Sequence, residues 1–183
     1  MLAAVLLAVL CGIERRDAKV LRDAGAGALL PVRRATVHDL ISLRAPRLSK
    51  WAARHRLERL VVQLDVEVLA YKTEEDGDVH AIIRGGRDVM VAELPLPICT
   101  WQSPYERQMN SARAAFQRLM RLHVQRVRIT GVVFFDKQHG QLGGAWNGVE
   151  LHPVLAVKAM GDKDSQEELK GEGEGTDEGA RGE

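Results

Sequence analysis

The chain has 183 residues, of which 45% are hydrophobic, and a formal net charge of +1. This length and composition can furnish one hydrophobic core, which is typical of a single domain with tails. The two cysteines, Cys11 and Cys99, have a spacing that predicts neither a disulfide framework nor a metal site.

The near-neutral total conceals a separation of charge along the chain. Residues 161–183 carry nine acidic side chains against three basic ones, whereas residues 33–60 carry eight basic side chains against two acidic ones. The basic arm 33–60 could contact nucleic acid or an anionic surface, or it could be a solvated arm. The acidic tail, residues 159–183, is too poor in apolar side chains to fold, so we expect it to be disordered.

Residues 1–13 form an apolar run of the length of an export segment. The run is too short to cross a bilayer as a helix of about 20 residues, so we expect no transmembrane span. No Lys or Arg precedes it, and Leu10 is a poor fit to the small residue found before a lipoprotein cysteine. We expect an exported or periplasmic protein, with the cytoplasm as the alternative location if the run is not a signal.

Residues 14–57 are predicted to be an irregular basic leader with one short helix, which Thr36 and Asp39 would begin as a capping box. Residues 60–72 then alternate apolar and polar side chains, a pattern typical of a half-buried strand. An Asp-Gly turn and a Gly-Gly turn separate two further strands, which we expect at 78–84 and 88–94.

A helix is predicted to begin at Ser103-Pro104-Tyr105-Glu106, with Ser as the cap, Pro at the first helical position and Glu reaching back to the cap. Apolar side chains recur every three or four residues up to about His123. Residues 125–136 and 148–157 are expected to be the last two strands, joined by a glycine-rich loop.

This element order predicts a mainly β (α+β) domain at residues 58–158. We expect a five-stranded OB-like barrel with one helix between the third and fourth strands, and an open α+β sheet is the alternative. In OB folds the second and third strands, with the first and last hairpin loops, commonly form the binding surface.

Polar residues gather in the last hairpin and on the second and third strands. Glu150 and His152 are two apart and share a face, and Glu93 shares with Val89 and Val91 a face that we expect to point inward. The candidate site comprises His80, Arg84, Arg87, Glu93, Asp136, His139, Glu150 and His152.

This set has two interpretations. The site could perform acid–base chemistry or bind a divalent metal through His139, Glu150 and His152. Alternatively, Glu150 and His152 hydrogen-bond loop amides while Asp136 and Asn147 cap turns, so that the residues only hold the loop in place.

Several stretches carry a resemblance to known proteins. They are Tyr71-Lys72, Asp76-Gly77-Asp78 with His80, Glu93 with Pro95, and the long phrase from Thr130 to Leu155 that includes His139-Gly140-Gln141 and Glu150-Leu151-His152-Pro153. With them, residues 62–157 resemble a group of uncharacterised bacterial exported proteins. That resemblance implies export and a shared fold, and it brings no known activity.

A looser similarity runs to staphylococcal-nuclease-like domains. It rests on Ala92-Glu93-Leu94-Pro95 and on the alanine-rich helix face from Ala112 to Phe116. The motif order of those nucleases is not reproduced, so catalysis is not transferred from them.

Three functions follow as hypotheses. The first is an exported OB-fold-like binding module for a polymer or protein partner. The second is a metal-dependent phosphodiesterase, with Arg84 or Arg87 neutralising phosphate. The third is a structural envelope protein without a ligand site.

Overall fold

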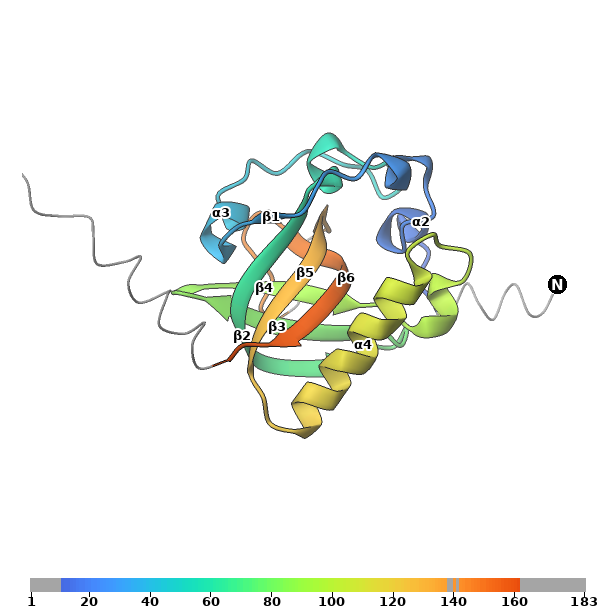
Figure 1. Ribbon diagram of the computed structural model, residues 1–183. Coiled ribbons are helices and arrows are strands. Elements are labelled where there is room, and N and C mark those ends of the chain that lie inside the picture. Colours follow the sequence, from blue (N-terminus) through green and yellow to red (C-terminus); the bar gives the residue numbers. More distant parts are fainter. Residues whose placement is uncertain (1–10, 138–139, 141, 162–183) are drawn as a thin grey trace, which may run out of the picture.

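The structure is a computed structural model that describes residues 11–137, 140 and 142–161 (Figure 1). The expected export segment up to residue 10 and the acidic tail from residue 162 lie outside the described residues. The strands are β1 (Arg33–Arg34), β2 (Val61–Thr73), β3 (Val79–Gly85), β4 (Asp88–Leu94), β5 (Arg126–Phe135) and β6 (Val149–Ala159).

The strands form a closed barrel, which confirms the predicted mainly β, OB-like fold. Their order is β1-β2-β3-β4-β6-β5, and β2 also pairs with β5. The long strand β2 closes the barrel because its first half pairs with β5 and its second half with β3. A short parallel pairing of β4 with β6, at Val91 and Glu150, joins the two sides.

Helix α4 (Glu106–Arg121) lies between β4 and β5 in the chain and packs mainly on β6. The predicted capping box at its start is wrong, because the N-cap is Tyr105 and no side chain caps the helix. Ser103 Oγ instead accepts a hydrogen bond from the Tyr105 amide and donates one to the Leu21 carbonyl. Within the described residues, none of the helices has the length and apolar character needed to cross a membrane.

The segment expected to be an irregular leader carries short elements that pack on the barrel. They are α2 (Arg16–Lys19), the 3-10 turn η1 (Ala24–Ala28), β1, α3 (Val37–Ile41) and the 3-10 turn η2 (Arg56–Arg59). The capping box of Thr36 and Asp39 at the start of α3 is confirmed. Leu21 and Ala26 of this segment form a small apolar cluster with Val61 and Val132, on the outside of the barrel wall.

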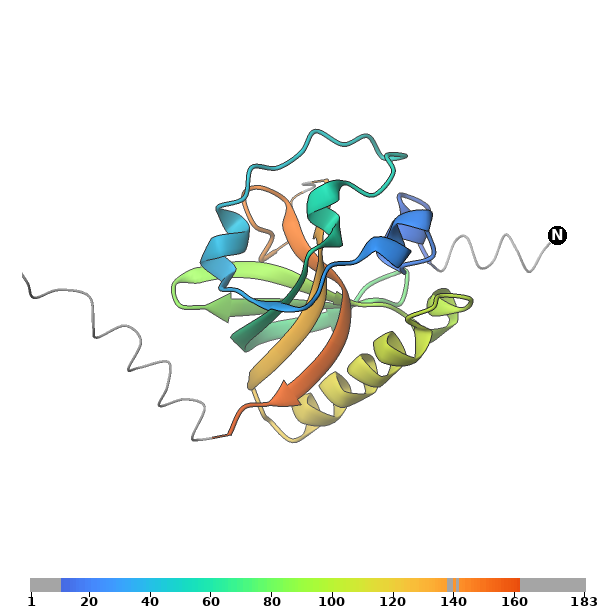
Figure 2. The same ribbon diagram turned by 45° about the horizontal axis from the view of Figure 1, so that its top comes forward.

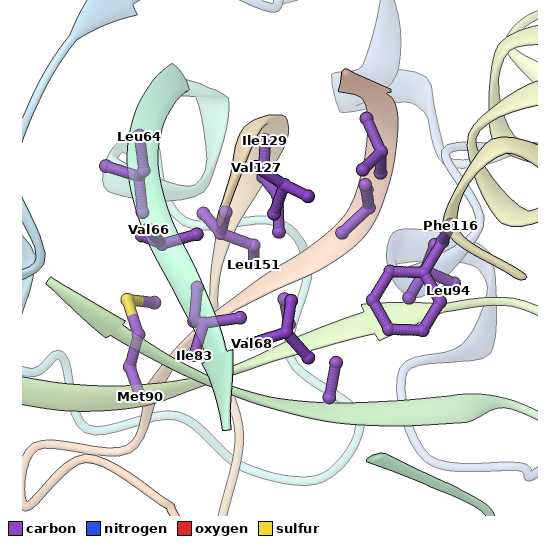
Figure 3. Close-up of a cluster of buried hydrophobic side chains, with 14 of the residues drawn as sticks. Leu64, Val66, Val68, Ile83, Met90, Leu94, Phe116, Val127, Ile129 and Leu151 are labelled. Atoms are coloured by element: carbon purple, nitrogen blue, oxygen red, sulfur yellow. The ribbon is translucent and has the colours of Figure 1, made fainter. Parts of the chain in front are cut away.

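The barrel interior is lined by apolar side chains that recur at every second residue, and Figure 3 shows part of this core, including Leu64, Ile83 and Leu151. On β4 the core residues are Met90, Ala92 and Leu94. Glu93 and its neighbours Val89 and Val91 therefore lie on the outer face, and the predicted inward face was wrong. The alternation could not identify the inner face because both faces of β4 are buried.

Cys11 and Cys99 form a disulfide, with their Cα atoms 5.6 Å apart. Their separation of 88 residues in the chain did not predict this pairing. Cys99 belongs to the 3-10 turn η3 (Pro97–Thr100), between β4 and α4. The disulfide therefore fastens the beginning of the described chain to the barrel, next to the start of α4.

Candidate functional site

A cluster of buried charged side chains lies on the outer face of the barrel, where β3, β4 and β6 meet. His80 stands opposite Glu93 in the β3–β4 register. Val91 stands opposite Glu150 in the β4–β6 register, so His152, two residues further, lies next to Glu93. Since neighbouring strands bring side chains on one face to about 5 Å, this register gathers the four residues. All four are buried.

His80 and Glu93 form the first pair of the cluster. His80 Nδ1 lies 2.7 Å from Glu93 Oε1, and His80 Nε2 lies 3.1 Å from the Leu142 carbonyl in the β5–β6 loop. The hydrogen bond to Glu93 raises the pKa of His80 to about 9, although burial acts in the opposite direction. His80 therefore holds its proton at neutral pH and bonds the loop to the barrel.

His152 and Glu150 form the second pair, with Nδ1 of His152 3.1 Å from Glu150 Oε1. His152 Nε2 has no hydrogen-bond partner within the described part of the chain, and Asp78 Oδ2 is 3.7 Å away. Burial lowers the pKa of His152. Burial also raises the pKa of Asp78 to about 6, although Asp78 accepts a hydrogen bond from the Leu96 amide.

Lys19 of α2 supplies the central cation of the cluster. Its Nζ lies 2.8 Å from Asp136 Oδ2 and 5.6 Å from the centre of the Phe134 ring. Burial alone would lower the pKa of Lys19, but the negative charges of Glu150 and Asp136 outweigh burial and raise it. Burial likewise opposes ionisation of Asp136, yet Lys19 keeps the pKa of Asp136 below its usual value. Lys19 thus joins the leader to the barrel wall.

The structure brings together five of the predicted site residues: His80, Glu93, Asp136, Glu150 and His152. His139 lies outside the described residues. Arg84 is not part of the cluster, because its side chain is exposed and pairs with Glu67 of β2. Arg87 is also outside the cluster, since it is exposed in the turn between β3 and β4.

The metal hypothesis gains no support from the residues that the structure describes. Two of the three proposed ligands, Glu150 and His152, are hydrogen-bonded to each other through Oε1 and Nδ1. Among the described residues, no group of three or more His, Cys, Asp and Glu side chains has a geometry that could hold a metal ion.

The structural interpretation fits Asn147 well. Its Nδ2 donates to the carbonyls of Leu40 and Leu43, and its Oδ1 accepts from the Val149 amide. Asn147 therefore fastens the end of the β5–β6 loop to α3.

A cavity of about 630 Å³ lies on the other side of α2, between α2, η1 and residues 51–54. Five arginines line it, and three of them have acidic partners. The paired arginines are Arg15 with Glu58 at 2.5 Å, Arg54 with Asp23 at 2.8 Å and Arg22 with Asp17 at 2.9 Å.

The other two arginines of the cavity, Arg16 and Arg59, have no acidic partner in a hydrogen bond or ion pair among the described residues, and Arg59 is exposed. The Nε of Arg16 is buried without a partner. Burial lowers the pKa of Arg16, and the nearby positive charge of Arg22 adds to this effect. Trp51 lines the same cavity with 64% of its surface exposed. Sequence reasoning named part of this site, since the basic arm 33–60 contains Arg54 and Arg59, but it missed Arg16, which lies in a helix too short to show a period.

Helix α2 connects the two charged regions. Arg16 lines the large cavity and also a smaller one, of about 200 Å³, whose walls include Lys19, Asp78 and Asp136. Arg15 binds Glu58, and Glu58 also accepts from the amides of His55 and Phe135. The buried cluster and Glu58 therefore fix the helix that carries Arg16, one of the two cavity arginines without an acidic partner.

The fold thus places the chain in the class of small, closed, OB-like barrels, extended here by an N-terminal segment. No family model matches the chain, and no curated protein is similar to it at a significant level. One similar solved structure is that of a protein described as an aspartyl-tRNA synthetase from Leishmania major Friedlin. It has a TM-score of 0.42 and 12% identity, and the match covers 69% of this chain and 20% of that protein. This likeness is too weak to support an argument about function.

Proposed function

We propose that this chain is an exported binding module whose ligand carries negative charge and enters the arginine-lined cavity. The observation that carries the proposal is a cavity wall with two arginines that have no acidic partner among the described residues, Arg16 with a buried, unpartnered Nε and Arg59 with an exposed side chain. A polar atom that is buried without a partner costs free energy, and an anion in the cavity would supply the missing partner of Arg16 Nε.

The chemistry of the wall favours an anion. Guanidinium groups bind carboxylate and phosphate through parallel hydrogen bonds. The carboxylates in the wall, Asp17 and Asp23, are already paired with Arg22 and Arg54. An anionic ligand would therefore meet two guanidinium groups that form no ion pair with an acidic side chain among the described residues.

The buried cluster on the other side of α2 supports a scaffold role. Lys19 lies among Asp136, Glu150 and Glu93, and His80 is paired with Glu93. Both cations of this cluster have acidic partners, Lys19 with Asp136 and His80 with Glu93, so these pairs hold α2 and the loop on the barrel.

Export is supported by the disulfide, since disulfides persist in oxidising compartments outside the cytosol. Cys11 is one of the two bonded cysteines, so its sulfur is not free to carry a lipid. If a signal segment is removed, the cut must fall before Cys11 for this disulfide to exist.

Calorimetric titration of the full chain with short-chain polyphosphate, at low and at high salt, tests the proposal. We expect binding that weakens with salt and is lost in an Arg16→Gln, Arg59→Gln double variant. An Arg118→Gln, Arg121→Gln variant is the matched control, because it removes the same charge from the exposed face of α4. Equal loss of binding in both variants would show that the cavity is not the site.

A further inference from the structure

Exposed apolar side chains lie in the wall of the arginine-lined cavity and on residues whose backbone is hydrogen-bonded to that wall. Ile13 and Trp51 form part of its wall and are 60% and 64% exposed. Trp101 is exposed, and its carbonyl accepts a hydrogen bond from Arg22 of the wall. Leu30 is exposed too, and its amide donates to the carbonyl of Arg59. Large apolar groups in water next to unpaired cations suggest a partner with both an apolar and an anionic part.

The same face is where the described chain begins. Cys11 is bonded to Cys99, whose neighbour Ile98 is also exposed, and Gly12 and Ile13 line the cavity. Figures 1 and 2 show that the coloured chain starts on the side of the molecule that carries α2 and the beginning of α4. In the sequence, residues 2–10 are all apolar.

We infer that this face docks on a membrane surface that contains anionic lipids. The lipid phosphate would bind Arg16 and Arg59 in the cavity. The apolar rim, defined as Ile13, Leu30, Trp51, Ile98 and Trp101, would enter the headgroup region. This inference rests on the proposed function, because it names the ligand of the same cavity.

The physical basis is the combination of two weak membrane signals. Tryptophan is enriched at membrane–water interfaces, and basic side chains are attracted to anionic leaflets. The strength of such surface binding scales with the apolar area buried in the headgroup region plus the attraction to anionic lipids, so the two signals add. Nucleic acid fits less well, because it would engage the arginines and an exposed ring but leave Ile13, Leu30 and Ile98 in water.

Vesicle flotation of the full chain tests the inference. Vesicles of phosphatidylcholine alone are compared with vesicles that also contain phosphatidylglycerol. We expect preference for the anionic vesicles, and a loss of affinity of about tenfold or more in the Arg16→Gln, Arg59→Gln variant. The Arg118→Gln, Arg121→Gln control should bind as the unaltered chain does. Equal binding to both kinds of vesicle would overturn the inference.

Quenching of tryptophan fluorescence by brominated lipid identifies the docking face. The chain has three tryptophans, Trp51, Trp101 and Trp146. Trp146 lies in the β5–β6 loop, and the next residue, Asn147, donates a hydrogen bond to Leu40 of α3. We expect quenching in a Trp146→Phe variant, which keeps Trp51 and Trp101, and little quenching in a Trp51→Phe, Trp101→Phe variant. Equal quenching in the two variants would mean that another face docks.

The two proposals fail separately. Binding of polyphosphate without binding of anionic vesicles would leave the anion site in place and overturn membrane docking. Tighter binding of an oligonucleotide than of anionic vesicles, lost in the same arginine variant, would also overturn membrane docking and assign the cavity to nucleic acid.

Discussion

The two charged regions on either side of α2 differ in how their charges are matched. In the buried cluster, Lys19 and His80 face the carboxylates of Asp136 and Glu93. In the cavity, Arg16 and Arg59 face no free carboxylate within the described chain. Removing one member of a buried ion pair is costly because it leaves a buried charge without its partner, whereas a cation without an acidic partner is available for a ligand. Substitutions in the first region should therefore lower stability, and substitutions in the second should lower binding.

The largest effect is expected for Lys19→Met. This change keeps the length of the side chain but leaves Asp136 and Glu150 without their nearest cation, so we expect a loss of about 3–5 kcal/mol in the free energy of unfolding. Urea denaturation at pH 7 measures it. Adding Asp136→Asn should restore part of the loss, because it removes one of the uncompensated charges. A loss below about 1 kcal/mol would mean that the cluster does not depend on Lys19.

Removal of the disulfide by Cys11→Ser and Cys99→Ser should cost roughly 2–4 kcal/mol, since it releases a long loop in the unfolded chain. The same variant tests whether the buried cluster alone, without the disulfide, keeps α2 in place. Amide hydrogen exchange should become faster before α2 and remain slow within α2 and in β3 and β6. Equally fast exchange through α2 would show that the disulfide, and not the cluster, fixes the helix.

The pH dependence of stability should reveal His80. Its pKa is raised to about 9 in the folded state from a usual value of 6.5. The resulting stabilisation is fully present below pH 6.5 and is lost as the pH rises through 9. Between pH 7 and 9.5 the unaltered chain should lose on the order of 2 kcal/mol more than a His80→Gln variant. Parallel stability curves for the two proteins would contradict the charged His80–Glu93 pair.

The smallest effect on stability is expected in the cavity. Arg59→Gln removes no ion pair within the described residues, so the free energy of unfolding should change by no more than about 0.5 kcal/mol. Arg16→Met should leave stability unchanged or raise it, because it removes a buried unpaired nitrogen. Thermal melts of both variants, run beside the polyphosphate titration, separate stability from binding. A large loss of stability in either variant would show that the cavity arginines, like the buried cluster, contribute to folding, and would contradict the proposed difference between the two regions.

The sequence predicted the barrel well because the strands alternate clearly and because the turns contain glycine. Its predictions failed where burial on both faces hid the inside of β4, so Glu93 was assigned to the wrong face. Lys19 was not predicted because it lies in a helix of four residues, too short to show a period. Pairing between Cys11 and Cys99 depends on contacts between distant parts of the chain, which spacing does not reveal. Export and the resemblance to exported bacterial proteins remain predictions.

The two-residue strand β1 has a consequence for self-association. It pairs in parallel with β2 at Val62 and Gln63, and the Ala35 amide continues the pairing to the Gln63 carbonyl. β1 thus occupies backbone groups along an edge of β2 that would otherwise invite a strand from another molecule. Its side chains, Arg33 and Arg34, are exposed charges, which discourage stacking of one copy on the next. A fragment that begins after β1 would expose this edge, so we expect it to aggregate more readily than the chain that retains β1.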